Sequence, residues 1–440
     1  MAEYRPNAMV RTPWGNAEEL RQRKLLPGLG TPHEEVVRNQ RERLFAAMVA
    51  TVAEKGYEAT TVADLVELSG VSRRTFYELF EGKLACFVAT VEALLEATVT
   101  MAAESYGGKG DWEARAKGLL QRFLMGLAAQ PAAARLCVVE AYAAGPLALA
   151  PLERAVDAIE EQIVVASATD PKRKQATREV TRAVLGGIHR ILYTHLSEGR
   201  EVELAGCFEE LWEWMSSYQP PPQPLRTRRA AGETISSPNG GPPFAARIPS
   251  ERILRRFAAA VSEKGYAETT IAEIAAQAQI SQATFYAHFA DKEDAMAAAI
   301  ESSARQIVAA TLPVLRRAKS APEGVRTALS AIFGFLAAEP EFARLQAVEV
   351  YSAGPKAVEL RNRTVAELVE VTMALVVDKR QWPSSVAEEA TVGAIGSILY
   401  DRIRKEGPES LPDAVPLAAY VALAPFIGKR RACAVARGEA

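Results

Sequence analysis

One short segment of the chain combines arginine, tyrosine and lysine in an order that suits contact with a polyanion. Arg73 and Arg74 are followed by Tyr77 and then by Lys83. Arginine donates paired hydrogen bonds to the O6 and N7 atoms of guanine, whereas tyrosine and lysine commonly contact phosphates. These residue types therefore predict nucleic-acid recognition. The net charge of the whole chain is −2, so such a surface must be local.

Residues for catalysis or metal binding do not occur in a recognisable pattern. The sequence has no Ser-His-Asp set, no phosphate-binding glycine loop and no dinucleotide-binding glycine fingerprint. His189 and His195 are six residues apart, which does not place them on one helix face. The four cysteines lack metal-binding spacing, and we expect reduced thiols: Cys86, Cys137, Cys207 and Cys433. We expect no enzymatic activity, no cofactor and no metal.

The arginine-bearing segment belongs to a long internal repeat. EKGY at 54–57 recurs at 263–266, and TFY at 75–77 recurs at 284–286, both with an offset of 209 residues. Farther along, Gly186 aligns with Gly393 at an offset of 207. This period excludes a solenoid, whose repeats span roughly 20–50 residues. The chain is predicted to hold two fused copies of one subunit.

Local signals in the first copy predict two short helices joined by a tight turn. Thr61 and Asp64 form a capping-box pattern. Gly70 permits a left-handed turn, and Ser72 caps a helix that runs through Phe80. Placed behind a longer helix, this arrangement is a helix-turn-helix, with its arginines on the outward face.

The second copy repeats this motif with two differences. Thr270 and Ser281 occupy the cap positions, but Gln282 and Ala283 replace the arginine pair. Glutamine suits adenine, and alanine offers only a methyl contact to thymine. Gln279 stands where the first copy has its turn glycine, and a left-handed glutamine costs on the order of 1 kcal/mol. We expect two reading helices that are not equivalent.

Both segments, EKGYEATTVADLVELSGVSRRTFYELFEGK and EKGYAETTIAEIAAQAQISQATFYAHFADK, resemble the N-terminal DNA-binding segment of the tetracycline-repressor (TetR) family of transcriptional regulators. The resemblance is good over 34–105 and 250–312 and only in outline beyond. Family members are usually homodimers, so it implies an all-α fold with an intramolecular pseudo-dimer. It also implies a double-stranded DNA operator. We expect DNA contact from Thr61, Ser72, Arg73, Arg74, Thr75, Tyr77, Lys83, Thr270, Ser281, Gln282, Thr284, Tyr286, His288 and Lys292.

The repeat and the resemblance together divide the chain into six segments. These are an N-terminal extension at 1–33, a first helix-turn-helix domain at 34–83, a first helical ligand-binding and dimerisation domain at 84–218, a Pro/Gly-rich linker at 219–249, a second helix-turn-helix domain at 250–292 and a second helical domain at 293–430. In the extension, a minor-groove arm and a disordered tail are the alternatives for Arg5, Arg11, Arg21, Arg23 and Lys24. The linker residues Arg226, Arg228 and Arg229 have the same two alternatives.

The helical domains are expected to bind an effector and to form the dimer contact. Segments 177–197 with 208–218, and 387–405 with 417–427, carry enough apolar residues for a four-helix interface. The pocket candidates are Phe123, Glu140, Tyr142, His189, Phe333, Glu349 and Tyr351. For the two Glu/Tyr pairs, a role in packing helix ends beside Gly145 and Gly354 is the alternative.

The sequence thus predicts a cytoplasmic repressor with no membrane partner, since no uninterrupted apolar run is long enough to span a bilayer. A small lipophilic ligand is expected to release it from an imperfectly palindromic operator. One alternative is a DNA-binding regulator that needs no ligand. The other is a ligand-binding or scaffolding protein whose second head has decayed, which Gln279 and the sparse charge near it favour slightly.

Overall fold

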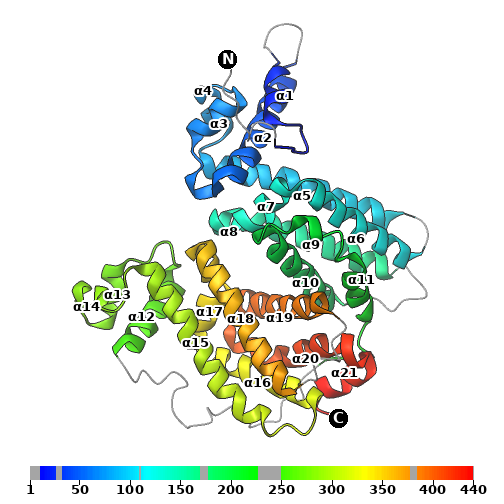
Figure 1. Cartoon of the computed structure of the whole chain (residues 1–440), viewed down its shortest axis with the longest axis vertical. Helices are drawn as coiled ribbons and strands as arrows, with labels where there is room; N and C mark the ends of the chain where they lie inside the picture. Colours follow the sequence, from blue (N-terminus) through cyan, green and yellow to red (C-terminus); the bar gives the residue numbers. More distant parts are fainter. Residues whose placement is uncertain are drawn as a thin grey trace. The chain divides into compact units, whose positions relative to one another are not determined.

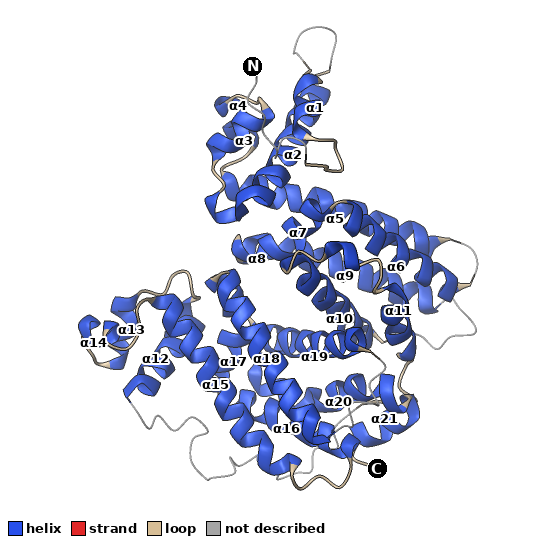
Figure 2. Cartoon of the chain, in the orientation of Figure 1, coloured by secondary structure: helices blue, strands red, loops and turns tan. Residues whose placement is uncertain are grey.

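The computed structural model describes residues 10–25, 32–108, 111–168, 177–225, 249–376 and 384–439. Within these ranges every regular element is a helix, so the expected all-α fold is confirmed (Figure 2). The chain divides into two compact units. Unit 1 comprises Met1–Asp170 with Leu192–Phe208, and unit 2 comprises Pro171–Ile191 with Glu209–Ala440. The predicted linker arginines and Arg5 lie outside the described residues.

Unit 1 opens with the first head and continues into a helical body (Figure 1). Its head helices are α1 (Ala17–Gln22), α2 (His33–Ala59), α3 (Val62–Ser69) and α4 (Arg73–Leu79). The body helices that follow are α5 (Lys83–Gly107), α6 (Trp112–Ala129), α7 (Pro131–Arg135), the π-helix η2 (Leu136–Glu140), α8 (Ala141–Ala143), α9 (Pro146–Ala168) and η3 (Glu201–Glu203). Helix α10 (Arg178–Ser197) continues from unit 2 into unit 1.

Unit 2 contains the second head, its body and a segment from the first copy of the repeat. The head helices are α12 (Pro249–Lys264), α13 (Ile271–Ala278) and α14 (Gln282–Tyr286). The body helices are α15 (Lys292–Leu315), α16 (Ala321–Ala338), α17 (Pro340–Ala347), η4 (Glu349–Ala353), α18 (Pro355–Val376), α19 (Ser385–Glu406), η6 (Pro408–Ser410), α20 (Leu411–Ile427) and α21 (Lys429–Ala436). Helix α11 (Phe208–Ser217) belongs to this unit from Glu209 onward.

The helices that the sequence assigns to a four-helix interface meet inside unit 2. Trp214 on α11 donates from Nε1 to Oγ1 of Thr391 on α19, at 2.9 Å. Just after α11, the hydroxyl of Tyr218 donates to the carbonyl of Val421 on α20, also at 2.9 Å. Helices α19 and α20 pack against each other. Buried indole and phenol groups normally take such partners, so these contacts fix how α11 meets α19 and α20.

Residues 10–25 form an addition to the first head that the sequence did not predict. Asn16 caps α1, and the ring centroids of Trp14 and Phe45 are 5.2 Å apart. Ala17 and Leu20 are buried, and Ala17 shares an apolar cluster with Ala47, Ala50 and Leu68. The disordered-tail alternative is therefore wrong for this stretch, because its apolar side chains are covered by α2 and α3.

Among the described residues, two helices have the length and apolar composition of a membrane span, namely α5 and Pro408–Ile427, and the bent pair Trp112–Ala129 and Pro131–Ala143 has them when taken together. Helix α20 continues through both Pro416 and Pro425, so these prolines do not interrupt it. In the structure α5 packs against α2, α6 and α9, while α20 packs against α16, α19 and α21. Most of the apolar window of Pro408–Ile427 is buried by this packing, whereas only 28% of the window in α5 is buried.

Candidate nucleic-acid interface

The first head holds its turn and reading helix with the caps that the sequence predicts. The backbone N–H of Thr61 donates to Oδ2 of Asp64 at 2.8 Å, and Thr61 Oγ1 accepts from the backbone N–H of Asp64 at 3.3 Å, which completes the capping box. Gly70 has φ 63°, and the Ser72 hydroxyl accepts from the backbone N–H of Thr75 at 3.0 Å. These contacts satisfy helix-end N–H groups and set where α4 begins.

The reading helix α4 buries one face and presents the other to solvent. Phe76 is fully buried, whereas Tyr77 is 49% exposed. Arg73 and Arg74 are also exposed, and the Arg73 guanidinium lies over the Tyr77 ring at 5.9 Å. Arg74 pairs with Glu78 one turn along, with 2.9 Å between Nε and Oε1. Such an exposed pair is weak, so the guanidinium can exchange it for a base or a phosphate.

The second head has the same framework with a different outward surface. Tyr286 is 53% exposed, and Gln282, Ala283 and His288 are exposed around it. Gln279 has φ 55° and ψ 45°, so this non-glycine residue adopts the left-handed conformation that the sequence raised as a concern. The Ser281 hydroxyl still accepts from the N–H of Thr284 at 3.0 Å.

The two lysines that close the motifs bind main-chain carbonyls near the end of α2 in the first head and just after α12 in the second. The Lys83 ammonium donates to the carbonyls of Tyr57 and Glu58, at 2.9 and 3.3 Å. Lys292 does the same at Tyr266, at 2.7 Å, and each ammonium lies 4.2 Å from the matching tyrosine ring. Burial lowers the pKa of both lysines. Phosphate contact by these two side chains stays a prediction.

A glutamate from each body binds the same tyrosine from the other side. The Glu140 carboxylate accepts from the backbone N–H of Tyr57 at 3.0 Å, and Glu349 accepts from that of Tyr266 at 2.9 Å. Gly56, just before Tyr57, has φ 78°, which turns the chain toward the carboxylate. These glutamates were candidates for a pocket or for helix-end packing. The structure places them where the head joins the body.

The other pocket candidates fall in both units. In unit 1, Phe123 is half-buried on α6 and Tyr142 packs edge-on against Tyr193, with ring centroids 5.6 Å apart. In unit 2, Phe333 is buried and Tyr351 meets Tyr400 in the same way at 6.1 Å.

The second tyrosine pair has charged neighbours. Arg361 donates to the Tyr351 hydroxyl at 2.7 Å. Burial, reinforced by Arg190 and Arg361, lowers the pKa of His189 to about 4.

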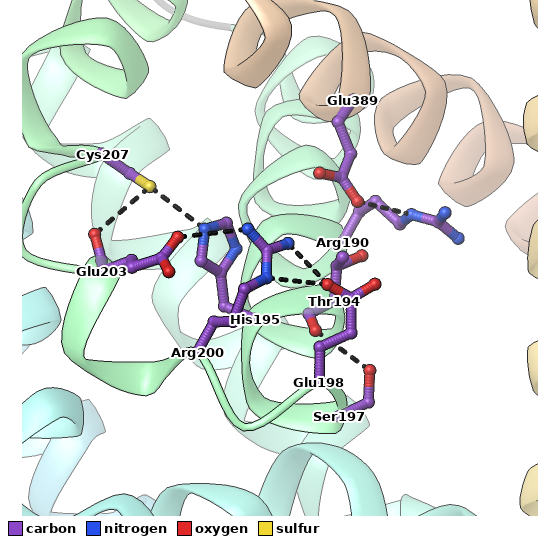
Figure 3. A network of polar contacts seen from close by, with 9 residues as sticks. All are labelled: Arg190, Thr194, His195, Ser197, Glu198, Arg200, Glu203, Cys207 and Glu389. Carbon is purple, nitrogen blue, oxygen red and sulfur yellow. Dashed lines mark hydrogen bonds and ion pairs between the residues drawn. The ribbon is translucent and has the colours of Figure 1, made fainter.

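Sequence reasoning missed two further features of the site. The buried Arg43 guanidinium donates to the carbonyl of Ser69 at 2.9 Å and so holds the end of α3 beside the turn. Its position inside α2 gave no signal of this role. His195 and Cys207 also meet, with 3.4 Å between Nε2 and Sγ (Figure 3). Among the described residues, no three His, Cys, Asp or Glu side chains come together as potential metal ligands. The Cys86 thiol is buried, which raises its pKa to about 12.

The family described as "Bacterial regulatory proteins, tetR family" matches residues 44–90 and 253–299, which contain both helix-turn-helix segments. No curated protein matches the chain.

Three solved structures are similar to part of the chain, and each covers 40% of it. The fatty acid degradation regulator FadR from Bacillus halodurans is 16% identical over 94% of its own length, with a TM-score of 0.37. The TetR family transcriptional regulator PfmR from Thermus thermophilus is 24% identical over 98%, with a TM-score of 0.32. FadR from Bacillus subtilis, solved in complex with stearoyl-CoA, is 16% identical over 97%, with a TM-score of 0.31. The two family matches coincide with the two capped, outward-facing reading helices, so both heads are DNA-binding segments of the kind found in the tetR family of bacterial regulatory proteins.

Proposed function

We propose that the chain is a single-chain pseudo-dimeric repressor, released from its operator by a small lipophilic ligand. The observation that carries the proposal is the presence of two capped reading helices, α4 and α14, in one polypeptide, each with an outward tyrosine. One short helix reads only a few base pairs, so specific binding uses two half-sites about 34–36 Å apart.

The operator we propose is an imperfect palindrome. The first head offers exposed Arg73 and Arg74, which suit guanine, whereas the second offers exposed Gln282 and Ala283. The half bound by the first head is therefore richer in guanine. Side chains around both reading helices contact the sugar-phosphate backbone and set the register of the protein on the DNA. In the first head these are Thr61, Ser72, Thr75 and Tyr77, and in the second they are Thr270, Ser281, Thr284, Tyr286 and His288.

Release by ligand uses the junction between head and body. The long helices α5 and α15 begin at Lys83 and Lys292, which bind main-chain carbonyls near the end of α2 and just after α12. Glu140 and Glu349 add a second attachment from the body. A ligand that shifts these body elements changes the orientation of the heads. Operator affinity then falls, because the ligand favours a state in which the heads cannot fit both grooves.

The first test is selection of bound fragments from sheared genomic DNA by the purified chain at physiological salt, where phosphate contacts alone give a non-specific background. An enriched, unequal palindrome bound by one chain supports the proposal. Equal half-sites contradict the asymmetry. A motif with only one half-site favours the alternative in which the second head, strained at Gln279, no longer reads sequence.

Ligand control is tested separately on the selected operator. Stearoyl-CoA, which the Bacillus subtilis FadR structure contains, is a suitable first lipophilic probe, followed by the free fatty acid and by shorter acyl chains. The proposal expects a ligand of this kind to bind the chain and weaken operator binding. Lipophilic ligands that bind without changing operator affinity would remove the coupling and leave a ligand-independent regulator.

A further inference from the structure

The backbones of α10 and α19 come very close together inside unit 2. A Cβ atom on Gly186 would lie 2.2 Å from Cβ of Ser397, and one on Gly393 would lie 2.3 Å from Cβ of Arg190. Real side chains do not approach so closely, so both glycines are needed for the two backbones to meet. Gly186 and Gly393 are equivalent positions in the two copies of the repeat, which makes this crossing the meeting point of the copies.

Two ion pairs lie on either side of this crossing. Arg182 Nε is 3.0 Å from Oδ2 of Asp401, and Arg190 Nε is 3.2 Å from Oε1 of Glu389 (Figure 3 shows the second pair). The four side chains are between 11% and 26% exposed, so water screens them only in part. Both cations come from the first copy of the repeat and both anions from the second.

The repeat itself shows what two identical copies would bring together. At the offset of 207 residues, Glu389 corresponds to Arg182, and Asp401 corresponds to Thr194. If two first copies met at this crossing, Arg190 of one would face Arg182 of the other. Symmetry would repeat that repulsion on the opposite side, and Arg182 would also lose its carboxylate partner.

The opposite pairing fails for the same reason. Arg182 corresponds to Glu389, and Arg190 corresponds to Ser397. If two second copies met, Asp401 of one would face Glu389 of the other, again twice by symmetry. A charge that is largely removed from water and lacks its partner is strongly destabilising. Both homotypic pairings therefore place like charges together at the crossing.

A neutral contact has the same preference. The indole of Trp214, from the first copy, donates to the Thr391 hydroxyl of the second copy at 2.9 Å. The equivalent of Thr391 in the first copy is Val184, which has no acceptor. Two first copies would leave the buried indole N–H without this bond, a loss that adds to the charge repulsion.

We propose that this interface selects unlike partners. One face of the first copy carries Arg182, Gly186, Arg190 and Trp214. This face binds the acidic face of the second copy and disfavours binding to the same face of another first copy. This inference rests on the proposed single-chain pseudo-dimer and adds a rule of partner choice to it. Charge placement of this kind discriminates between partners more than it adds affinity. The two copies have thus become a matched pair that cannot be exchanged for two of either one.

The test uses the full chain with a protease site inserted in the linker between residues 226 and 248. The folded protein is cut at that site, and native mass spectrometry follows its composition during dilution. We expect complexes of one first-copy fragment with one second-copy fragment, and no homotypic dimers. Homotypic dimers as abundant as mixed ones, or fragments that separate at the concentration used for cutting, would overturn the proposal. The readout is mass, so it is independent of operator binding.

Charge variants make the test specific. Glu389→Arg gives the second copy the residue of the first, and we expect the mixed pair to weaken by about tenfold or more. Adding Arg190→Glu restores opposite charges and should recover most of that loss. Glu406→Arg is the matched control, because Glu406 is half-exposed on the same helix and pairs with Arg402 one turn away. A Glu389→Arg protein that dissociates like the control, or a double variant with no recovery, would refute the charge code.

Discussion

Gln279 is the residue at which local strain is most direct. Among the residues that the structure describes, it is the one non-glycine residue with a positive φ, at 55°. It occupies the turn between α13 and α14. We expect Gln279→Gly to raise the free energy of unfolding by up to about 1 kcal/mol, because glycine adopts this conformation without a Cβ clash. Urea unfolding of the two proteins measures the difference.

The equivalent turn in the first copy supplies the control. Gly70 has φ 63°, and a Cβ atom there would lie 3.1 Å from Nη2 of Arg43. Gly70→Gln should therefore lower the free energy of unfolding, through both the backbone conformation and the displacement of the buried guanidinium. If Gln279→Gly is destabilising, the second turn is held by contacts of the glutamine side chain, and strain is not its main feature.

His189 gives the fold a dependence on pH. Its pKa is lowered from 6.5 to about 4 by burial, with the nearby charges of Arg190 and Arg361 acting in the same direction. The imidazole therefore binds a proton near pH 6.5 in the unfolded chain but only near pH 4 in the folded chain. The free energy of unfolding consequently decreases as the pH falls through this window. Between pH 7 and pH 5 the expected loss from this residue is on the order of 1–2 kcal/mol.

Replacing the imidazole checks that assignment. His189→Asn should remove this part of the pH dependence, which urea unfolding at pH 7 and pH 5 measures. His33→Gln, at the exposed first residue of α2, is the matched substitution and should leave the dependence as it is. Equal pH dependence in wild type and His189→Asn would show that other groups control stability in this range.

At the scale of elements, each head packs on its body through its long helix, and one tyrosine peptide in each head is also bound at both of its polar groups. The N–H of Tyr57 is bound by Glu140 and its carbonyl by Lys83, and Tyr266 is bound in the same way in the second copy. A carboxylate that accepts from an N–H makes a stronger bond than a neutral acceptor. These contacts orient the head as a unit without touching the reading helix.

Removing one glutamate should therefore reduce sequence-specific binding selectively. We expect Glu140→Ala to lower operator affinity by about tenfold, because the bond is charge-assisted and sets head orientation. Affinity for random DNA should stay the same, since phosphate contacts dominate it. Fluorescence anisotropy with both DNAs measures the split. Glu104→Ala, at an exposed site on α5, is the control, and an equal fall on both DNAs would indicate general loss of structure.

The sequence predicted most elements of the heads because their signals are local. Caps at Thr61, Ser72, Thr270 and Ser281 and the turn glycine fix where short helices begin and end, and the structure has them all. Helix α1 was missed because its signal is weak. Asn16 caps only six residues, and the helix is stabilised by burial against α2 and α3 rather than by its own sequence. The roles of Arg43 and Glu140 depend on contacts with residues far along the chain, which no local pattern shows.

At the scale of the whole molecule, the two heads have diverged while staying in one chain. Arg73→Ala should cost about 1–3 kcal/mol of operator binding and relax base preference in the first half-site alone. Gln282→Ala should relax the other half-site. Competition binding with operators mutated in one half at a time separates the effects. Loss of preference in both halves from one substitution would mean that a single head reads the whole site.

The duplication was predictable from the repeat, and the helices that meet in unit 2 were predictable from their apolar content. The preference of each copy for the other at that contact was not predictable from the sequence. Arg182 and Glu389 occupy equivalent positions in the two copies. Their opposite charges indicate a partner preference only because Asp401 faces Arg182 and Arg190 faces Glu389. Sequence periodicity identifies a buried face, but it does not say which residues of another helix lie across it.

The matched faces of the two copies also affect whether a mutation is dominant or recessive. In a regulator assembled from separate identical chains, one defective allele spoils most assemblies, because damaged and intact chains mix. Here the opposite charges at the α10–α19 crossing join copies that are already in the same polypeptide. In the proposed single-chain pseudo-dimer, where the linker keeps both copies together, a lesion in the reading helix stays within the molecules that its own allele encodes. In a cell that carries both alleles, such a lesion is expected to be recessive rather than dominant-negative.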